Sequence, residues 1–176
     1  MRSVALPYLE IVAAGIWWTI GAAALGPGVG TVVLAAGLGT TGALVAALRR
    51  RHGSGEPLPP GGRSRVLRLI VGALALIAVA AVGLGFLGYG ELAVPIGCAV
   101  VGGAALLLSP VLADRAPFAA GSALMVLGAA GTVLALDSAG ALYPQGVVGL
   151  GAGAVLWLFG AQRTGLLAEV RERTGR

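Results

Sequence analysis

Three carboxyl side chains lie within or at the ends of strongly apolar segments, where charged groups are costly and often functional. Glu10 falls in the first apolar segment, while Glu91 and Asp137 fall at two short polar breaks further along the chain. A carboxyl group in a dry, apolar setting can keep its proton at neutral pH and pass it to a bound molecule. We therefore predict Asp137, Glu91 and Glu10 as candidate catalytic residues for proton-initiated chemistry.

Each acid also has a purely structural interpretation. Glu10 can pair with a cytoplasmic arginine such as Arg115 or Arg163, or it can reach the lipid headgroups. Glu91 and Asp137 can simply be solvated at helix ends, and no arginine lies close to them in the sequence. Both interpretations stay open at this point.

Aromatic and amide side chains are the candidate substrate-binding residues. Trp17 shares a helical face with Glu10, seven positions earlier, and all three tryptophans lie well inside apolar segments. They can line an apolar cavity for a lipophilic ligand, or they can fill gaps left by glycines. The tyrosines beside the outer acids can join a polar pocket, or they can belong to the interfacial aromatic belt. The predicted substrate-binding set is Trp17, Trp18, Trp157, Tyr89, Tyr143 and Gln145.

Several kinds of chemistry lack the residues they need. Cys98 is the only cysteine, which excludes an internal disulfide and a cysteine metal cluster. His52 is the only histidine, so neither a histidine metal site nor a Ser-His-Asp triad is expected inside the membrane. The spans also lack a cation that could hold a pyrophosphate. We therefore expect no metal site and no cofactor.

Composition places the chain in lipid. Apolar residues make up 57% of the 176 residues and charged residues only 11%, whereas a soluble domain carries about 25% charge. A helix needs about 20 apolar residues to cross the hydrocarbon core. Six segments meet this requirement, which predicts an all-α, integral membrane bundle of six transmembrane helices, arranged as three hairpins in a single domain, 1–176. The predicted spans are approximately 6–25, 29–48, 66–88, 92–112, 117–136 and 146–162.

Arginine sets the expected orientation. All twelve basic residues are arginine, and they fall near the N-terminus, around the 49–65 loop, at the "ADRAP" turn or near the C-terminus. Because arginine-rich loops stay in the cytoplasm, both termini, the 49–65 loop and the tail 163–176 are predicted to be cytoplasmic, in a bacterial inner membrane. The tail is expected to carry a short interfacial helix. The net charge of +5 then reflects cytoplasmic loops rather than nucleic-acid binding.

Small residues are expected to form the helix interfaces, because they let membrane helices approach closely. Glycine-rich patterns occur at 37–42, 83–88 and 146–153, and the chain has 31 glycines in all. These faces can also support a homo-oligomer. Hydroxyls within the spans are expected to bond to preceding backbone carbonyls; the residues concerned are Thr19, Thr31, Thr40, Thr41 and Ser122.

The stretch "YGELAVPIGCAVVGGAALLLSPVLADRAPFAAGSALMVLGAAG", at 89–131, resembles the central part of small bacterial membrane proteins of unknown function, and "AAGIWW" in the first span also fits. This resemblance implies six helices and no particular activity. The short multi-pass format is similar to that of small membrane terpene cyclases. Members of that class protonate a prenyl chain with Asp or Glu, which implies an acid-catalysed, metal-independent isomerase or cyclase.

Three functions are compatible with these features. The first is a protein that binds a lipophilic small molecule in an intramembrane pocket, with or without acid-catalysed isomerisation or cyclisation of a prenyl substrate. The second is a small transporter or channel subunit for a small molecule or a cation. The third is a structural or assembly partner of another membrane protein. Membrane lipids are expected partners in every case.

Overall fold

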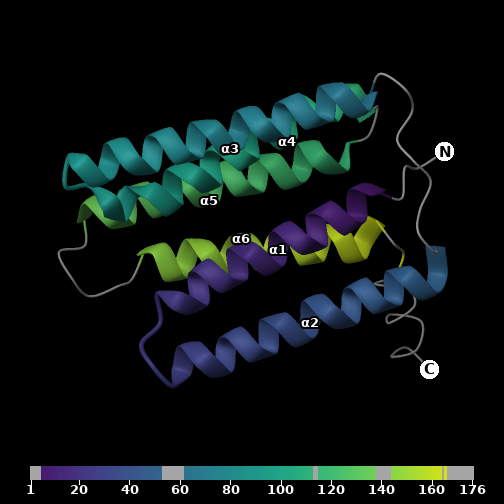
Figure 1. The fold of residues 1–176 in the computed structure, drawn as a ribbon, viewed down its shortest axis with the longest axis horizontal. Coiled ribbons are helices and arrows are strands. Elements are labelled where there is room, and N and C mark those ends of the chain that lie inside the picture. The colour runs from purple at the N-terminus through teal and green to yellow at the C-terminus, as the bar shows by residue number, and fades with distance from the viewer. Residues whose placement is uncertain (1–4, 53–61, 113–114, 138–143, 164, 166–176) are drawn as a thin grey trace.

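The structure is a computed structural model that describes residues 5–52, 62–112, 115–137, 144–163 and 165. Within these residues the chain is helical throughout and contains no strand (Figure 1). The prediction of an all-α chain with six long helices is confirmed. The elements are α1 (Ala5–Ala23), α2 (Val29–His52), α3 (Gly62–Phe86), the short 3-10 helix η1 (Gly90–Leu92), α4 (Ala93–Leu112), α5 (Ala116–Asp137) and α6 (Pro144–Arg163).

The second and third helices extend further than predicted. Helix α2 continues through the arginines 49–51 to His52, and α3 already begins at Gly62. Arginine is a good helix former, and α2 meets no glycine or proline between Gly42 and Gly53, so nothing stops the helix at the edge of the apolar segment. The predicted 49–65 loop is therefore too long, because helix occupies both of its ends.

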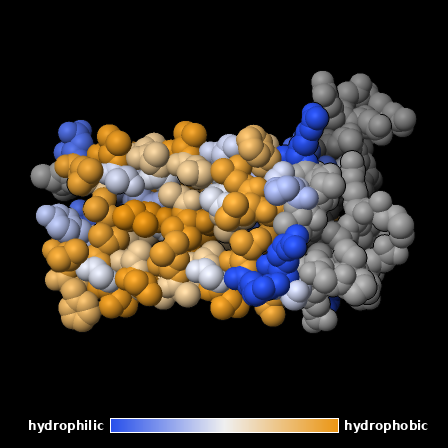
Figure 2. Space-filling view, turned by 90° about the horizontal axis from the view of Figure 1, so that it is seen from above, coloured by the Kyte–Doolittle hydropathy of each residue, from blue (hydrophilic) through white to orange (hydrophobic). Residues whose placement is uncertain are grey.

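Five of the described helices are long and apolar enough to cross a membrane, and the apolar stretch of α1, Tyr8–Ala23, is shorter. Figure 2 shows apolar side chains covering the middle of the molecule, with hydrophilic side chains toward its two ends. Several helices of this kind indicate a multi-pass membrane protein. The five candidate spans are Val29–Arg50, Ser64–Phe86, Gly90–Pro110, Ala116–Asp137 and Pro144–Gln162.

The six helices pack side by side in an order that differs from the order of the chain. The pairs α1–α2, α3–α4 and α5–α6 pack as hairpins, and the most extensive contacts join α1 to α6 and α4 to α5. Helices α5 and α4 also contact α6, so these four helices form the centre of the bundle. Helix α2 packs on α1 at one flank, and α3 packs on α4 at the other (Figure 1).

Glycines let the central helices touch backbone to backbone. A Cβ built on Gly149 of α6 would lie 2.5 Å from the backbone nitrogen of Gly21 on α1. A Cβ on Gly102 of α4 would lie 2.7 Å from the carbonyl oxygen of Gly121 on α5. Such close approaches exclude any side chain at these positions. The glycine pattern at 146–153 is thus confirmed as a helix interface.

The other two predicted glycine patterns behave differently. Among the glycines of the 37–42 pattern only Gly37 meets another helix, because a Cβ added at Gly39 or Gly42 would have open space around it for 4 Å. The glycines of the 83–88 pattern have open space beside them for 4 Å, and Gly88 has a positive φ of 80° at the end of α3. The prediction that this pattern packs helices within the chain is therefore wrong.

Described charged residues are separated between the two ends of the bundle. The end of α2 and the starts of α3 and α5 lie at the same end of the bundle as the start of α1 and the end of α6 (Figure 1). The opposite end holds Glu91 and Asp137, both exposed. The described arginines with exposed side chains at the first end are Arg49, Arg50, Arg65, Arg68 and Arg115.

Candidate functional site

Trp18 joins three helices. Its Nε1–H donates a 2.7 Å hydrogen bond to the backbone carbonyl of Val33 on α2. The same indole lies against Trp157 of α6, with ring centroids 4.6 Å apart and ring planes tilted by 37°. Residue 37 must be small for this arrangement, because a Cβ on Gly37 would overlap the indole ring. Trp18 therefore fixes the positions of both α2 and α6 against α1.

Trp17 points away from Trp18, because neighbouring residues on a helix face directions about 100° apart. Its side chain is 8% exposed and belongs to the apolar core, together with Cys98 of α4 and Leu124 of α5. Trp157 packs against the edge of this core. The structure thus brings two of the three predicted tryptophans into direct contact and places Trp17 in the packed centre of the bundle.

Oγ1 of Thr41 and Nε1 of Trp157 are buried and have no hydrogen-bond partner among the residues that the structure describes. The expectation for span hydroxyls is confirmed for Thr19 and Thr40, which donate to the carbonyls of Gly15 and Ala36 at 2.9 Å. It is wrong for Thr41. Adjacent helical residues point in different directions, and Thr40 is exposed whereas Thr41 turns toward α1.

Glu10 lies in the first half of α1, beside the last turns of α6. Its Cβ is 4.0 Å from the position that a Cβ on Gly160 would take. The carboxylate oxygen Oε2 is buried. Glu10 is therefore the one predicted acid that the described structure places within the packed part of the bundle.

The other predicted acids and their neighbours lie at the far end of the bundle from the described arginines. Glu91 belongs to η1, which packs against α5 and α6, and Asp137 ends α5. Both carboxylates are exposed, Tyr89 is 57% exposed, and Gln145 is half-buried in the first turn of α6. Tyr143 lies outside the described residues. The described members share one end of the molecule.

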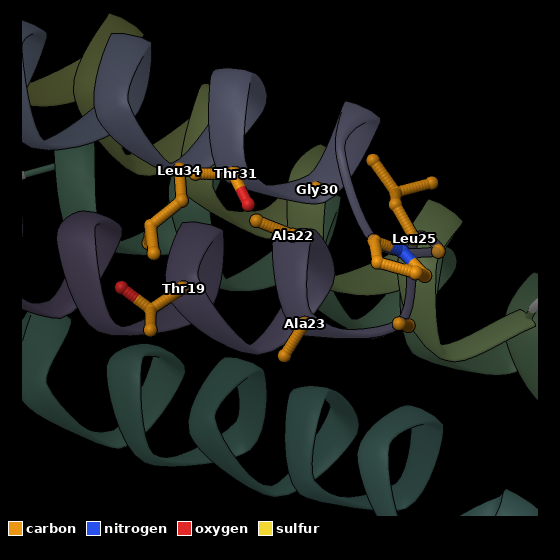
Figure 3. A pocket seen from close by; sticks show the side chains of 10 residues that line it. Thr19, Ala22, Ala23, Leu25, Gly30, Thr31 and Leu34 are labelled. Carbon is orange, nitrogen blue, oxygen red and sulfur yellow. The ribbon is translucent and has the colours of Figure 1, made fainter.

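The pocket found in the structure is not predicted from the sequence. It is open, has a volume of about 440 Å³, and lies where α1 ends and α2 begins (Figure 3). Gly30 allows α2 to start close to α1, since a Cβ there would lie 2.6 Å from the carbonyl oxygen of Ala22. The sequence feature that could have indicated this pocket is the run of small residues on both sides of the "GPG" turn. The lining residues are Thr19, Ala22, Ala23, Ala24, Leu25, Gly26, Pro27, Gly30, Thr31 and Leu34.

Side chains that ligate metals are dispersed in the described part of the chain. No group of three or more His, Cys, Asp or Glu side chains there is placed to hold a metal ion. Cys98 is buried, and its thiol donates a 3.3 Å hydrogen bond to the carbonyl of Leu124. This bond ties α4 to α5 and gives the thiol a structural role.

The chain was compared with protein-family models, with curated proteins and with solved structures, and none of them matches. The resemblances of segment 89–131 and of the terpene-cyclase format therefore stay predictions. The function has to be inferred from the geometry of the protein's own helices.

Proposed function

We propose that this chain is a six-span membrane protein with both termini in the cytoplasm, and that it binds a neutral lipophilic molecule between α1 and α2. The observation that carries the proposal is the 440 Å³ pocket at the α1–α2 contact. Small-molecule sites typically have volumes of about 300–1,000 Å³, with mostly apolar walls and a few polar groups. The proposed span count includes α1, because this helix contacts α6 along most of its length.

The lining suggests the class of ligand. Alanine, leucine, proline and glycine supply most of the wall, and the described lining includes no charged side chain. Thr19 uses its hydroxyl within α1, whereas the hydroxyl of Thr31 is exposed toward the pocket (Figure 3). A prenyl chain that carries one neutral polar group fits such a surface better than an ion or a phosphate does.

A steric block tests this site. Thr31→Phe should fill the pocket and remove the binding of radiolabelled farnesol that this pocket contributes in membranes that contain the protein. Val32→Phe is the matched control, because Val32 is the next residue on α2, is 71% exposed and does not line the pocket. Equal farnesol binding by the two variants and the unmodified protein would refute the α1–α2 site.

Proton-initiated isomerisation or cyclisation of the bound prenyl molecule is the catalytic form of this proposal. The observation that favours it is the buried oxygen Oε2 of Glu10, although Glu10 lies in the first half of α1 and the pocket at the end of that helix. A bound prenyl chain would have to extend along α1, by about 14 Å from Thr19, to reach this carboxyl group. Glu10→Gln should then abolish turnover while farnesol binding persists. Asp137→Asn and Glu91→Gln test the two exposed acids, and retention of turnover in all three variants would rule out acid catalysis by these residues.

Service as an assembly partner is the second candidate function. It is favoured by the glycines on the outward sides of the flanking helices: Gly39 and Gly42 of α2 and Gly72, Gly83 and Gly85 of α3 have open space beside them. Small residues of this kind can receive a further membrane helix. Stable co-purification with one membrane protein, lost in Gly83→Leu and kept in Gly103→Ala, would support it. The transport alternative gains no support from the described residues, whose buried positions are apolar or glycine.

A further inference from the structure

The unpartnered polar atoms of Thr41 and Trp157 lie at the same depth in the bundle. A Cβ on Gly15 would lie 3.0 Å from Thr41 Oγ1, so this hydroxyl is level with Gly15 of α1. Helix α6 runs antiparallel to α1: Gly153 meets the carbonyl of Ala14, and Gly160 meets Ile11, each at 3.0 Å from the glycine's Cβ position. On α6, Trp157 lies between Gly153 and Gly160, and its indole ring packs against the ring of Trp18.

The side chains of Thr41 and Trp157 contact the same stretch of α1, at Gly15 and Trp18. Side chains on a helix lean toward its N-terminus. Trp157 on α6 and Thr41 on α2 therefore both lean toward the end of the bundle where α6 and α2 begin, and both reach the stretch of α1 between Ala14 and Trp18. This site, formed by Trp157 Nε1 and Thr41 Oγ1 beside α1, is separate from the α1–α2 pocket, because neither residue lines that pocket.

An unpaired donor at such a depth is expensive. An indole N–H or a hydroxyl without a partner in an apolar medium costs several kcal/mol, because no water is available to replace the lost hydrogen bond. Other hydroxyls in the spans avoid this cost by bonding to a backbone carbonyl, as Thr132 does with Gly128 at 2.9 Å. The tryptophan indole next to Trp157 avoids it too, since Trp18 donates to Val33.

We propose that Trp157 Nε1 and Thr41 Oγ1 together bind one neutral oxygen atom from a molecule that enters the bundle. The oxygen accepts the indole N–H and exchanges a hydrogen bond with the hydroxyl. A neutral oxygen of this kind belongs to a water molecule or to the hydroxyl of a lipophilic alcohol. An anion is disfavoured because no basic side chain is among the groups that form the site.

The NMR signal of the Trp157 indole N–H, which reports whether this group is hydrogen-bonded, tests the proposal directly. The three tryptophans, labelled with ¹⁵N, give three indole N–H signals in detergent micelles, and Trp157→Phe and Trp18→Phe assign two of them. Trp18 is an internal reference for a hydrogen-bonded indole. We expect the Trp157 signal at a similarly downfield position in aqueous micelles or after addition of farnesol. A signal that stays at the position of an indole without an acceptor under both conditions would overturn the proposal.

Two isosteric variants provide a second test, of stability. Thr41→Val should lower the melting temperature, because it leaves the bound oxygen without one partner. If the hydroxyl had no partner, the same change would raise the melting temperature or leave it unchanged, and that result would exclude Thr41 from the site. Thr40→Val is the matched control, because Thr40 is exposed and bonds only within α2.

The source of the oxygen is decided by a matched pair of ligands. Farnesol and farnesene have the same prenyl chain, but only farnesol carries a hydroxyl. If the ligand supplies the oxygen, farnesol should move the Trp157 signal. Farnesol should also bind about tenfold more tightly than farnesene, and Thr41→Val should remove this preference. If water supplies it, the signal is downfield before any addition and unchanged by both compounds. Thr31→Phe, which blocks the separate pocket, leaves the water result intact and so distinguishes the two sites.

Discussion

Single glycines decide where the large side chains of this bundle can lie. Trp18 reaches the Val33 carbonyl because Gly37, one turn further along α2, presents no side chain to the indole. Gly153 does the same on α6, where a Cβ would come within 3.1 Å of the Trp18 Cβ. The tryptophan and its glycines therefore act as one structural unit, and changing any of them should move the indole.

Substitution of Gly37 tests that unit. Gly37→Ala should destabilise the protein by about 1–3 kcal/mol, because the new methyl group overlaps the Trp18 ring. Gly39→Ala should be neutral or stabilising by up to about 1 kcal/mol, because its methyl group meets open space and alanine favours the helix. Unfolding in detergent, followed by tryptophan fluorescence, measures both. Equal destabilisation by the two variants would contradict this role for Gly37.

At the scale of helices, the contact between α4 and α5 depends on small residues spaced along one face of each. Gly121 and Gly128 of α5 meet the backbone of α4, and a Cβ on Gly128 would lie 2.7 Å from the carbonyl oxygen of Pro95. Leu124, fully buried, fills the space between them. Helix α3 packs only at the outside of this pair, and Val66, near its start, is the one buried residue of its candidate span.

Two adjacent glycines of α4 give a matched test of this contact. Gly102→Ala places a methyl group 2.7 Å from the Gly121 carbonyl oxygen and should force α4 and α5 apart, at a cost of about 1–3 kcal/mol. Gly103→Ala points into open space and should change the free energy of unfolding by less than about 1 kcal/mol. Thermal unfolding in detergent compares the two. If Gly103→Ala proved the more damaging, the face that α4 turns toward α5 would have to be a different one.

At the scale of the whole molecule, the separation of charge predicts the orientation in the membrane. Among the described residues, exposed arginines lie at one end of the bundle and the exposed carboxylates of Glu91 and Asp137 at the other. Arginine-rich ends remain on the cytoplasmic side during insertion. Residues in the connection between α2 and α3 should therefore face the cytoplasm, and those between α5 and α6 should face outward.

Thiol labelling measures this orientation. In a Cys98→Ala background, Ser138→Cys should react with a membrane-impermeant maleimide in intact cells, because Ser138 follows the outer end of α5. Ser54→Cys should react only after the cells are opened. Each variant serves as the control for the other. Labelling of Ser54→Cys in intact cells would reverse the proposed topology.

The sequence predicts the number and approximate limits of the helices well, because a run of about 20 apolar residues can form few stable structures in lipid other than a spanning helix. It predicts poorly how each helix is rotated. These helices are apolar on nearly all sides, so no polar face marks the direction of the bilayer. Gly83 and Gly102 look equally suited to an interface in the sequence, yet only Gly102 contacts a neighbouring helix.

The same ambiguity applies to the site. The sequence predicts one cavity lined by Trp17 and Trp18, but their faces differ, and only the partners of α1 decide which ring enters the core. Thr41 looks no different from Thr40 until α2 is placed against α1. Glu10 is the part of the prediction that depends least on rotation, because a carboxyl one or two turns into an apolar helix is unusual wherever it points.

The pairing of α1 with α6 has a consequence for how the protein is made. Helix α1 is synthesised long before α6, on which it mainly rests, so its glycine-containing face has no lasting partner until α6 has been made. Until then α1 has to be held by the insertion machinery or by lipid alone. Final closure of the bundle is thus a late, post-insertion event, and a nascent chain that stalls before residue 144 would expose an incomplete interface to the quality-control proteases of the membrane.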